Sequence, residues 1–171
     1  MTKNPKKKSA LAIRTSTPFP SRSKELFPPA LLRDIRLLIE GARRRVATAV
    51  NSEMVTLYWL IGERIRRDIL LSERAPYGEQ IVDALSRHLS EEYGRGFSRP
   101  NLFHMIRFAE GFPDRKIVYA LSRQLSWTHL RQIIYLDDPL QREFYTQMCR
   151  IEGWSTRTLQ DKIRGLLYEP Q

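Results

Sequence analysis

From Pro29 onward, apolar residues recur at the three- and four-residue steps of an α-helix, and this periodicity constrains the fold more than any other feature. Alternating patterns typical of strands are nearly absent. About seven helices can be placed from apolar spacing and from residues that start or end helices. At 171 residues, the chain has the length of one domain with one hydrophobic core. The sequence therefore predicts an all-α, multi-helix domain over residues 29–171.

Apolar spacing also predicts which face of each long helix is buried. The first two helices are expected over about 30–48 and 51–71, with no clear break between them, and a third over 79–93. Gly62 indicates a close contact with another helix, and Gly94 stands where a left-handed C-terminal cap belongs. The residues expected to face inward, including those of a later helix that ends at Gly153, are Leu31, Ile35, Leu38, Ala42 and Val46; Met54, Leu57 or Tyr58, Ile61, Ile65 and Ile69; Ile81, Leu85 and Leu89; and Leu140, Phe144, Met148 and Ile151.

Four later helix starts carry capping signals. In three of them an apolar residue precedes a serine and another apolar residue follows four positions after it, which is the pattern of a hydrophobic staple around a serine N-cap. The fourth combines an aspartate cap, a proline and a glutamine that completes a capping box. These starts are Phe97-Ser98 with Leu102, Leu125-Ser126 with Leu130, Trp154-Ser155 with Leu159, and Asp138-Pro139 with Gln141. They predict helix pairs joined by tight turns.

One helix pair has the proportions of a helix-turn-helix unit. It consists of a helix over 79–93, a turn over 94–97 and a second helix over 99–110. At about 100° per residue, one arc of the second helix must face the core. The residues on that arc are Leu102, Met105, Ile106 and Ala109. The predicted fold therefore has a helix-turn-helix-like centre.

The second helix of this unit offers side chains that suit DNA. His104 and Arg107 are expected to point into solvent, away from the core. Asn101 lies at the margin of that face, and Arg99 is in the first turn. Arginine can pair bidentately with guanine and asparagine with adenine, and N–H groups at a helix N-terminus can bind phosphate. The pattern has no specific signature, so an all-helical domain with an ordinary solvated helix face explains the same residues.

The positive charge is concentrated at the N-terminus. The net charge is +10, from 29 Lys and Arg against 19 Asp and Glu. Residues 1–28 carry seven of the basic residues against a single acid, among prolines, serines and threonines. Such a segment is predicted to be a disordered basic arm. Its dense run, Lys6, Lys7 and Lys8, suits DNA phosphates, although a solubilising tail explains it equally well.

Several classes of site are excluded by what the chain lacks. A single cysteine, Cys149, excludes an internal disulfide framework, and three scattered histidines give no zinc-ligand spacing. Asp114 and Lys116 are the only candidates for a metal-dependent nuclease centre, but no strand pattern surrounds them, so we reject them. No cofactor is predicted. No run approaches the roughly 18 apolar residues of a membrane span, and no secretion signal is present, so we expect a cytoplasmic protein without a membrane partner.

A series of short motifs follows the chain in this order: Val50-Asn51 with Leu57-Tyr58-Trp59-Leu60-Ile61-Gly62, Tyr77-Gly78, Leu85-Ser86, Gly96-Phe97-Ser98-Arg99-Pro100-Asn101-Leu102, Leu125-Ser126-Trp127-Thr128-His129, Arg142-Glu143-Phe144-Tyr145, and Gly153-Trp154-Ser155-Thr156-Arg157-Thr158-Leu159. Together these motifs resemble the N-terminal domain of the YhcG-type bacterial proteins. The resemblance covers about residues 30–168. It implies a bacterial origin, a helical module regarded as DNA-binding, and a nucleic-acid context, since this domain usually precedes a PDDEXK nuclease domain. The chain ends at Gln171, where the nuclease half would start, so we expect no enzyme activity.

Two functions remain open at this point. The first is an accessory module of a PDDEXK-type nuclease system that binds duplex DNA through phosphate contacts from the arm and from helix-face arginines. The alternative is a protein-interaction or oligomerisation module. In that alternative, exposed Phe103 and Phe108 and the first two long helices pack on a second copy or on a separately encoded nuclease subunit.

Overall fold

The computed structural model describes residues 28–70 and 75–165. Within these ranges the chain forms seven α-helices and three short helical turns of other types, and no strand. The all-α prediction is therefore confirmed. The predicted basic arm, with Lys6, Lys7 and Lys8, lies outside the described residues apart from Pro28.

The first two predicted helices are one helix. α1 (Pro29–Ile65) runs for 37 residues without a break and is followed by a π-helical turn, η1 (Arg66–Leu70). The chain divides into two units, Met1–Glu40 and Gly41–Gln171, and α1 begins in the first unit and ends in the second.

The apolar stripe at the start of α1 is exposed in the described structure. Its members Leu31, Ile35, Leu38 and Val46 are all exposed, Leu38 by as much as 72%. The buried residues of this helix begin only at Val55. The prediction of an inward-facing stripe is therefore wrong for these residues, because helical periodicity shows that a stripe exists and does not show what covers it.

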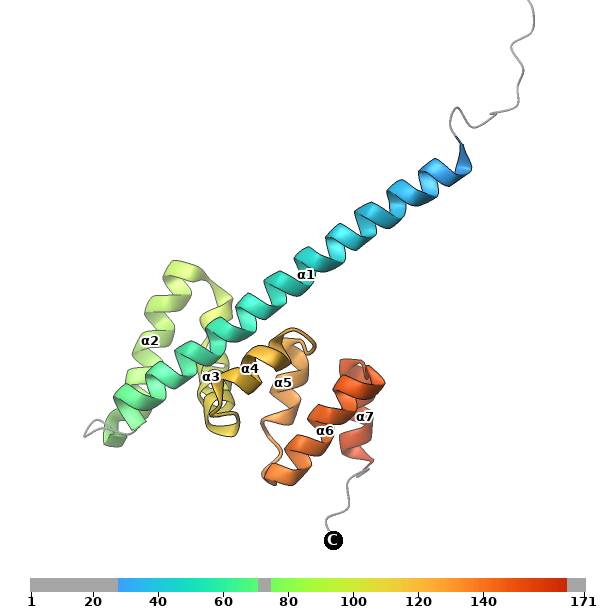
Figure 1. The fold of residues 1–171 in the computed structure, drawn as a ribbon. Helices are drawn as coiled ribbons and strands as arrows, with labels where there is room; N and C mark the ends of the chain where they lie inside the picture. The colour runs from blue at the N-terminus through green and yellow to red at the C-terminus, as the bar shows by residue number, and fades with distance from the viewer. Residues whose placement is uncertain (1–27, 71–74, 166–171) are drawn as a thin grey trace, which may run out of the picture. The chain divides into compact units, whose positions relative to one another are not determined.

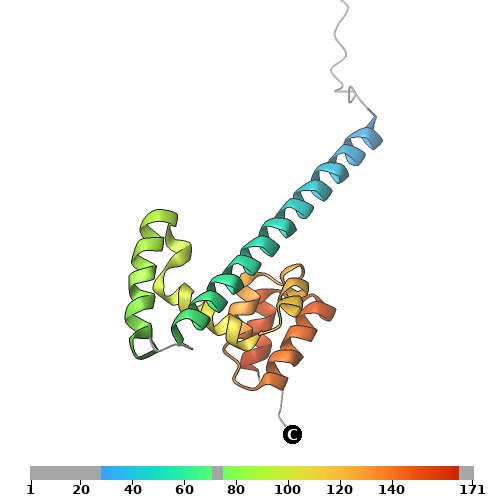
Figure 2. The same cartoon turned by 60° about the vertical axis from the view of Figure 1, so that its left-hand side comes forward.

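The rest of the second unit consists of shorter helices (Figures 1 and 2). α2 packs on α3, and α5 contacts α3, α6 and α7, so α5 joins α3 to the C-terminal helices. The elements are η2 (Ala75–Tyr77), α2 (Gly78–Tyr93), η3 (Arg95–Phe97), α3 (Arg99–Gly111), α4 (Arg115–Ser122), α5 (Trp127–Ile133), α6 (Pro139–Glu152) and α7 (Thr156–Arg164).

α1 and α3 approach closely at Gly62. A Cβ atom on this residue would lie 1.9 Å from the carbonyl oxygen of Met105 and 2.9 Å from the backbone nitrogen of Ile106. No side chain fits there, so glycine is required for the two backbones to pack. The predicted close helix contact is confirmed.

Aromatic side chains from three helices make the centre of the core. The rings of Tyr58 and Phe108 both meet the ring of Trp127 edge to face, with centroids 5.0 and 5.6 Å away. The indole N–H of Trp59 donates to the carbonyl of Phe112 at 2.8 Å. All four residues predicted on the inner arc of α3 are buried: Leu102, Met105, Ile106 and Ala109.

Three of the four predicted capping residues accept a hydrogen bond at the start of their helix. Ser98, the predicted cap of α3, accepts none, and the capping box predicted for Gln141 in α6 is not formed among the described residues. The side chains of Ser126, Asp138 and Ser155 each accept a hydrogen bond from a backbone N–H in the first turn that follows. Ser126 also forms a capping box with His129, whose ring nitrogen accepts from the Ser126 N–H at 3.3 Å. Because each such bond joins residues two or three positions apart, local sequence is enough to predict it.

Two glycines end helices with a positive φ. Gly153 ends α6 with φ 63° and ψ 35°, in the left-handed helical region, as expected. Gly94 ends α2 with φ 90°, but its ψ of −167° lies outside that region. The expected left-handed cap at Gly94 is therefore replaced by another conformation that still favours glycine.

The buried face of α6 differs from the predicted one. Leu140 and Ile151 are exposed, whereas the buried residues are Tyr145, Thr146 and Cys149. Thr146 is accommodated because its hydroxyl donates to the carbonyl of Arg142 at 2.7 Å. The helix carries apolar residues on two adjacent stripes, and packing against its neighbours decides which of them is buried.

Candidate nucleic-acid interface

Arg99, in the first turn of α3, is tied to α2. Its guanidinium forms ion pairs with Asp83 and, at 3.8 Å, with Glu79. It also lies 4.8 Å from the centre of the Phe103 ring. The side chain remains half exposed. Arg99 therefore fixes the start of α3 against α2, and two carboxylates compensate its charge.

Asn101 connects the turn before α3 to α5. Its side-chain amide donates to the carbonyl of Gly96, and its side-chain oxygen accepts a hydrogen bond from the indole N–H of Trp127 at 3.1 Å. The side chain is partly buried. Both ends of the amide are engaged within the protein, so the geometry gives Asn101 a positioning role.

His104 and Arg107 lie against the segment that joins α5 to α6. The Nδ1 atom of His104 lies 2.5 Å from the hydroxyl of Tyr135. The guanidinium of Arg107 donates to the carbonyl of Ile134 at 2.8 Å and to the carboxylate of Asp137 at 2.9 Å. Both side chains are partly buried, so the expectation that they point freely into solvent is corrected. The predicted arc is right, but a neighbouring segment covers part of it.

The charge of His104 depends on its surroundings. Burial and, secondarily, the positive charge of Arg131 lower the pKa of His104 below its usual value of 6.5. The imidazole is therefore neutral at pH 7. The permanent positive charge beside it comes from Arg131, which is exposed on α5.

A shallow hollow of about 290 Å³ lies between the N-terminus of α3 and α5. Two of the predicted site residues, Asn101 and His104, line it, whereas Arg99 and Arg107 are not among its lining residues. Arg95 and Arg131 also line it, and both are exposed. Within residues 28–70 and 75–165, no carboxylate forms an ion pair with Arg95 or Arg131.

Arg95 and Arg131 are not among the residues that the sequence predicts to bind DNA. Arg95 lies in the turn of the predicted helix-turn-helix unit, between Gly94 and Gly96, and an arginine flanked by glycines in that turn was an available signal. Arg131 lies on another helix, and only the packing of α5 on α3 brings it to the hollow. No spacing rule along the chain connects the two.

The two phenylalanines assigned to a docking surface are not exposed. Phe108 is completely buried and contacts both Trp127 and Phe112 edge to face. Phe103 is partly buried and packs against the core beneath Arg99. The exposure expected for Phe108 is wrong, because its ring fills the centre of the unit.

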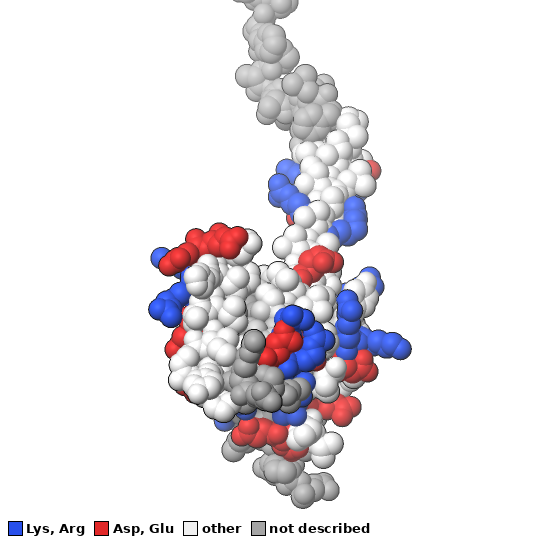
Figure 3. All heavy atoms as spheres, turned by 90° about the vertical axis from the view of Figure 1, so that its left-hand side faces the viewer, with Lys and Arg blue, Asp and Glu red and all other residues white. Residues whose placement is uncertain are grey.

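Surface charge on the side of α2 is mixed. Figure 3 shows Lys and Arg side chains interspersed with Asp and Glu side chains rather than gathered into one basic field. A polyanion that approached this face would meet both signs of charge. For the binding of such a polyanion, individual arginines without carboxylate partners would therefore contribute more than the net charge of the chain.

Asp114 caps a helix, and Cys149 is buried in the core. Asp114 accepts a hydrogen bond from the backbone N–H of Lys116 at 2.8 Å and caps α4, a helix start that the sequence analysis did not identify. Burial raises the pKa of Cys149 to about 11, so its thiol is protonated at neutral pH. In the part of the chain that the structure describes, no cluster of three His, Cys, Asp or Glu could hold a metal ion. No helix there is long and apolar enough to span a bilayer.

Comparison with known proteins relates this arrangement to one family. The family model described as the DUF1016 N-terminal domain matches residues 34–170. The protein named putative nuclease YhcG, from Escherichia coli (strain K12), is 29% identical over an alignment of length 162, and the match covers 77% of this chain and 43% of that protein. The chain thus spans less than half the length of this relative. No solved structure matches it. The chain belongs to the DUF1016 N-terminal domain family.

Proposed function

We propose that this chain is an accessory module of a PDDEXK-type nuclease system and that it binds duplex DNA. The observation that carries the proposal is the hollow at the start of α3, where Arg95 and Arg131 stand without carboxylate partners. Guanidinium groups and N–H groups at a helix N-terminus both bind phosphate. The relative carries the name putative nuclease YhcG, which is consistent with a nucleic-acid context.

The geometry favours phosphate contact over base reading. Arg99 and Arg107 are held by carboxylates, and both ends of the Asn101 amide are bonded within the protein. Arg95 and Arg131 remain available and can neutralise phosphates. Phosphate contacts orient a protein on DNA without carrying sequence information directly. We therefore expect binding with little sequence preference, and we assign catalysis to other parts of the nuclease system.

Binding should depend steeply on salt. If about four to six phosphates are contacted, the logarithm of the association constant should fall against the logarithm of salt concentration with a slope near −4 to −5. Substitution of Arg95 and Arg131 by alanine should weaken binding to all sequences and make the slope less negative by about 2. Fluorescence anisotropy with a labelled random duplex measures both quantities.

A matched control removes two positive charges elsewhere. Arg87 on α2 and Arg164 on α7 are also exposed, and their double alanine variant should bind nearly as well as the wild type. Absence of binding by the wild type at micromolar concentration and low salt would exclude the proposal. If the two double variants bind DNA with equal affinity, the hollow is not part of the DNA interface.

A second candidate function is oligomerisation or docking of a nuclease subunit. The exposed apolar residues Leu31, Leu37 and Leu38 of α1 favour it, because helices with apolar stripes commonly pair. We expect replacement of Leu31 and Leu38 by lysine to convert an oligomer into a monomer without loss of helix content. Light scattering measures the mass and circular dichroism the helix content. A wild-type protein that is monomeric at all concentrations would argue against self-association.

A further inference from the structure

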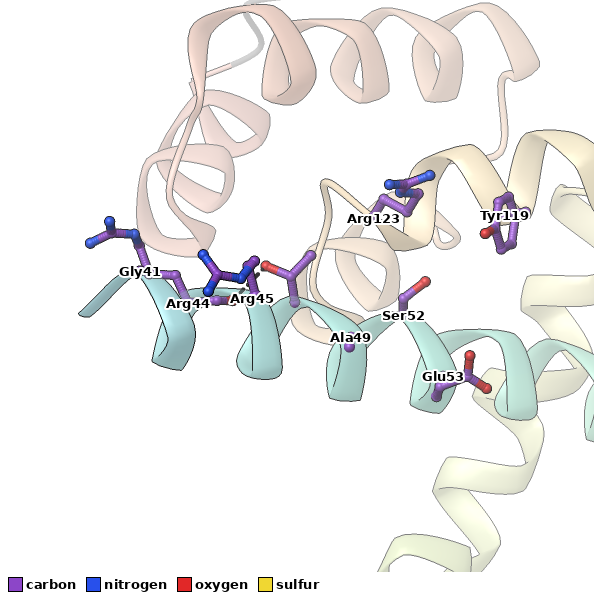
Figure 4. A pocket seen from close by; sticks show the side chains of 9 residues that line it. Gly41, Arg44, Arg45, Ala49, Ser52, Glu53, Tyr119 and Arg123 are labelled. Atoms are coloured by element: carbon purple, nitrogen blue, oxygen red, sulfur yellow. Dashed lines mark hydrogen bonds between the residues drawn. The ribbon is translucent and has the colours of Figure 1, made fainter. Parts of the chain in front are cut away.

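A second basic site lies in the Gly41–Gln171 unit, between α1 and α4. It is a groove of about 550 Å³, and Figure 4 shows the side chains that line it. Arg44 and Arg45 come from α1, and Arg123 comes from the C-terminal end of α4. We call it the arginine groove, and it does not share a lining residue with the hollow at α3.

Hydrogen bonds between α1 and α4 set the width of the arginine groove. The side-chain amide of Asn51 donates to the carbonyls of Ser122 and Leu125, at 2.9 Å in each case. The Ser122 hydroxyl donates to the carbonyl of Tyr119 at 2.9 Å. Since that proton is used, the Ser52 hydroxyl is the donor in its 2.8 Å contact with Ser122. The two walls are therefore held together before any ligand binds.

The charge of the groove is unbalanced. The charged side chains that line the groove are three arginines and one carboxylate, that of Glu53. Among the described residues, no carboxylate forms an ion pair with Arg44, Arg45 or Arg123. All three arginines are exposed, so a ligand can reach them. An anion in the groove would reduce the repulsion between them.

One contact positions a guanidinium group of the groove. The guanidinium of Arg123 lies 6.0 Å from the centre of the exposed Tyr119 ring. An ordered arginine loses less side-chain freedom when it binds an anion.

We propose that the arginine groove binds phosphate groups, and that their source is the sugar-phosphate backbone of a DNA strand. Guanidinium groups match phosphate oxygens in pairs of hydrogen bonds. Arg44, Thr48 and Ser52 follow one another at four-residue steps along about 12 Å of α1, so the lining suits an extended ligand. The choice of DNA rests on the proposed function, whereas a free nucleotide would offer the same phosphate chemistry.

The test compares the wild type with a variant in which Arg44, Arg45 and Arg123 are all replaced by glutamine. With a labelled duplex in anisotropy, the variant should lose about 10- to 100-fold in affinity, and its salt slope should become less negative by about 2 to 3. A control with glutamine at Arg87, Arg157 and Arg164 removes the same charge from exposed positions on α2 and α7. It should lose less than about threefold, since non-specific field effects are screened.

A single substitution keeps the test valid if the triple variant does not fold. Glu53→Gln removes the one carboxylate of the groove from an exposed position, so it should leave the melting temperature unchanged. It should tighten DNA binding about two- to threefold. Unchanged or weaker binding by Glu53→Gln, or a triple variant that binds like its control, would overturn the groove proposal while leaving DNA binding at α3 intact.

A second arm distinguishes the source of the phosphate. Pyrophosphate and ADP are added to the wild type and the triple variant, and the melting temperature is measured. No shift at millimolar concentration, together with DNA binding that depends on the groove, supports the proposal. A rise in the wild type alone, without DNA binding, would assign the groove to free phosphates and overturn both the DNA source and the proposed function. No response to any of these probes would exclude the site.

Discussion

Replacement of Gly62 by alanine is expected to lower the free energy of unfolding by about 3 kcal/mol, the upper end of the usual cost of overpacking. The new Cβ atom would lie 1.9 Å from the carbonyl oxygen of Met105, and a backbone atom cannot move aside as a flexible side chain can. Either α1 and α3 separate or both helices bend. Thermal unfolding followed by circular dichroism should show a melting temperature lower by roughly 6–12 °C.

Gly41→Ala is the matched control, because this glycine lies in the same helix. Its added Cβ would meet only the end of the Arg45 side chain, at 3.4 Å. Alanine is better than glycine inside a helix by about 0.5–1 kcal/mol, so this variant should be slightly more stable than the wild type. If both variants melt at the wild-type temperature, α1 and α3 do not pack as described.

Phe108→Ala is expected to cost about 3–5 kcal/mol, because it removes a completely buried ring and leaves a cavity. The ring contacts Trp127 and Phe112, so its loss reaches α5 as well as the end of α3. Urea denaturation should show a lower midpoint. DNA affinity should fall only as far as the protein unfolds, since Phe108 is not on either basic surface.

Ile151→Ala is the control for this experiment. Ile151 is 74% exposed on α6, although apolar spacing predicts it to be buried. Its replacement should change the free energy of unfolding by less than about 0.5 kcal/mol. A large loss at Ile151 together with a small loss at Phe108 would support the burial expected from sequence and contradict the structure.

The candidate interface shows how tertiary contacts change the role of a residue. The sequence marks Arg99 and Arg107 as the basic residues of α3. In the folded protein, Arg99 pairs with Asp83, and Arg107 pairs with Asp137. Arg95 and Arg131 in the hollow and the three arginines of the groove have no carboxylate partner among the described residues.

The sequence by itself determined that the fold is all-α and where α5, α6 and α7 begin, but it did not predict the start of α4. Caps such as Ser126 and Ser155 act on N–H groups three residues away, and helical periodicity acts between residues three or four apart. The close helix contact at Gly62 could also be predicted, since a glycine inside a strongly periodic helix indicates close packing. These features depend on neighbours along the chain.

Only the tertiary structure decided which stripe of α6 is buried, that Phe108 lies in the core, and which arginines lack a carboxylate partner. Each of these depends on residues distant in sequence. The bond from Asn51 to the carbonyl of Ser122 joins α1 to α4 beside the arginine groove, and Arg131 reaches the hollow beside Asn101 because α5 packs on α3. Burial and charge compensation are set by all the atoms around a side chain, and the packing of the helices assembles those atoms from separate parts of the chain.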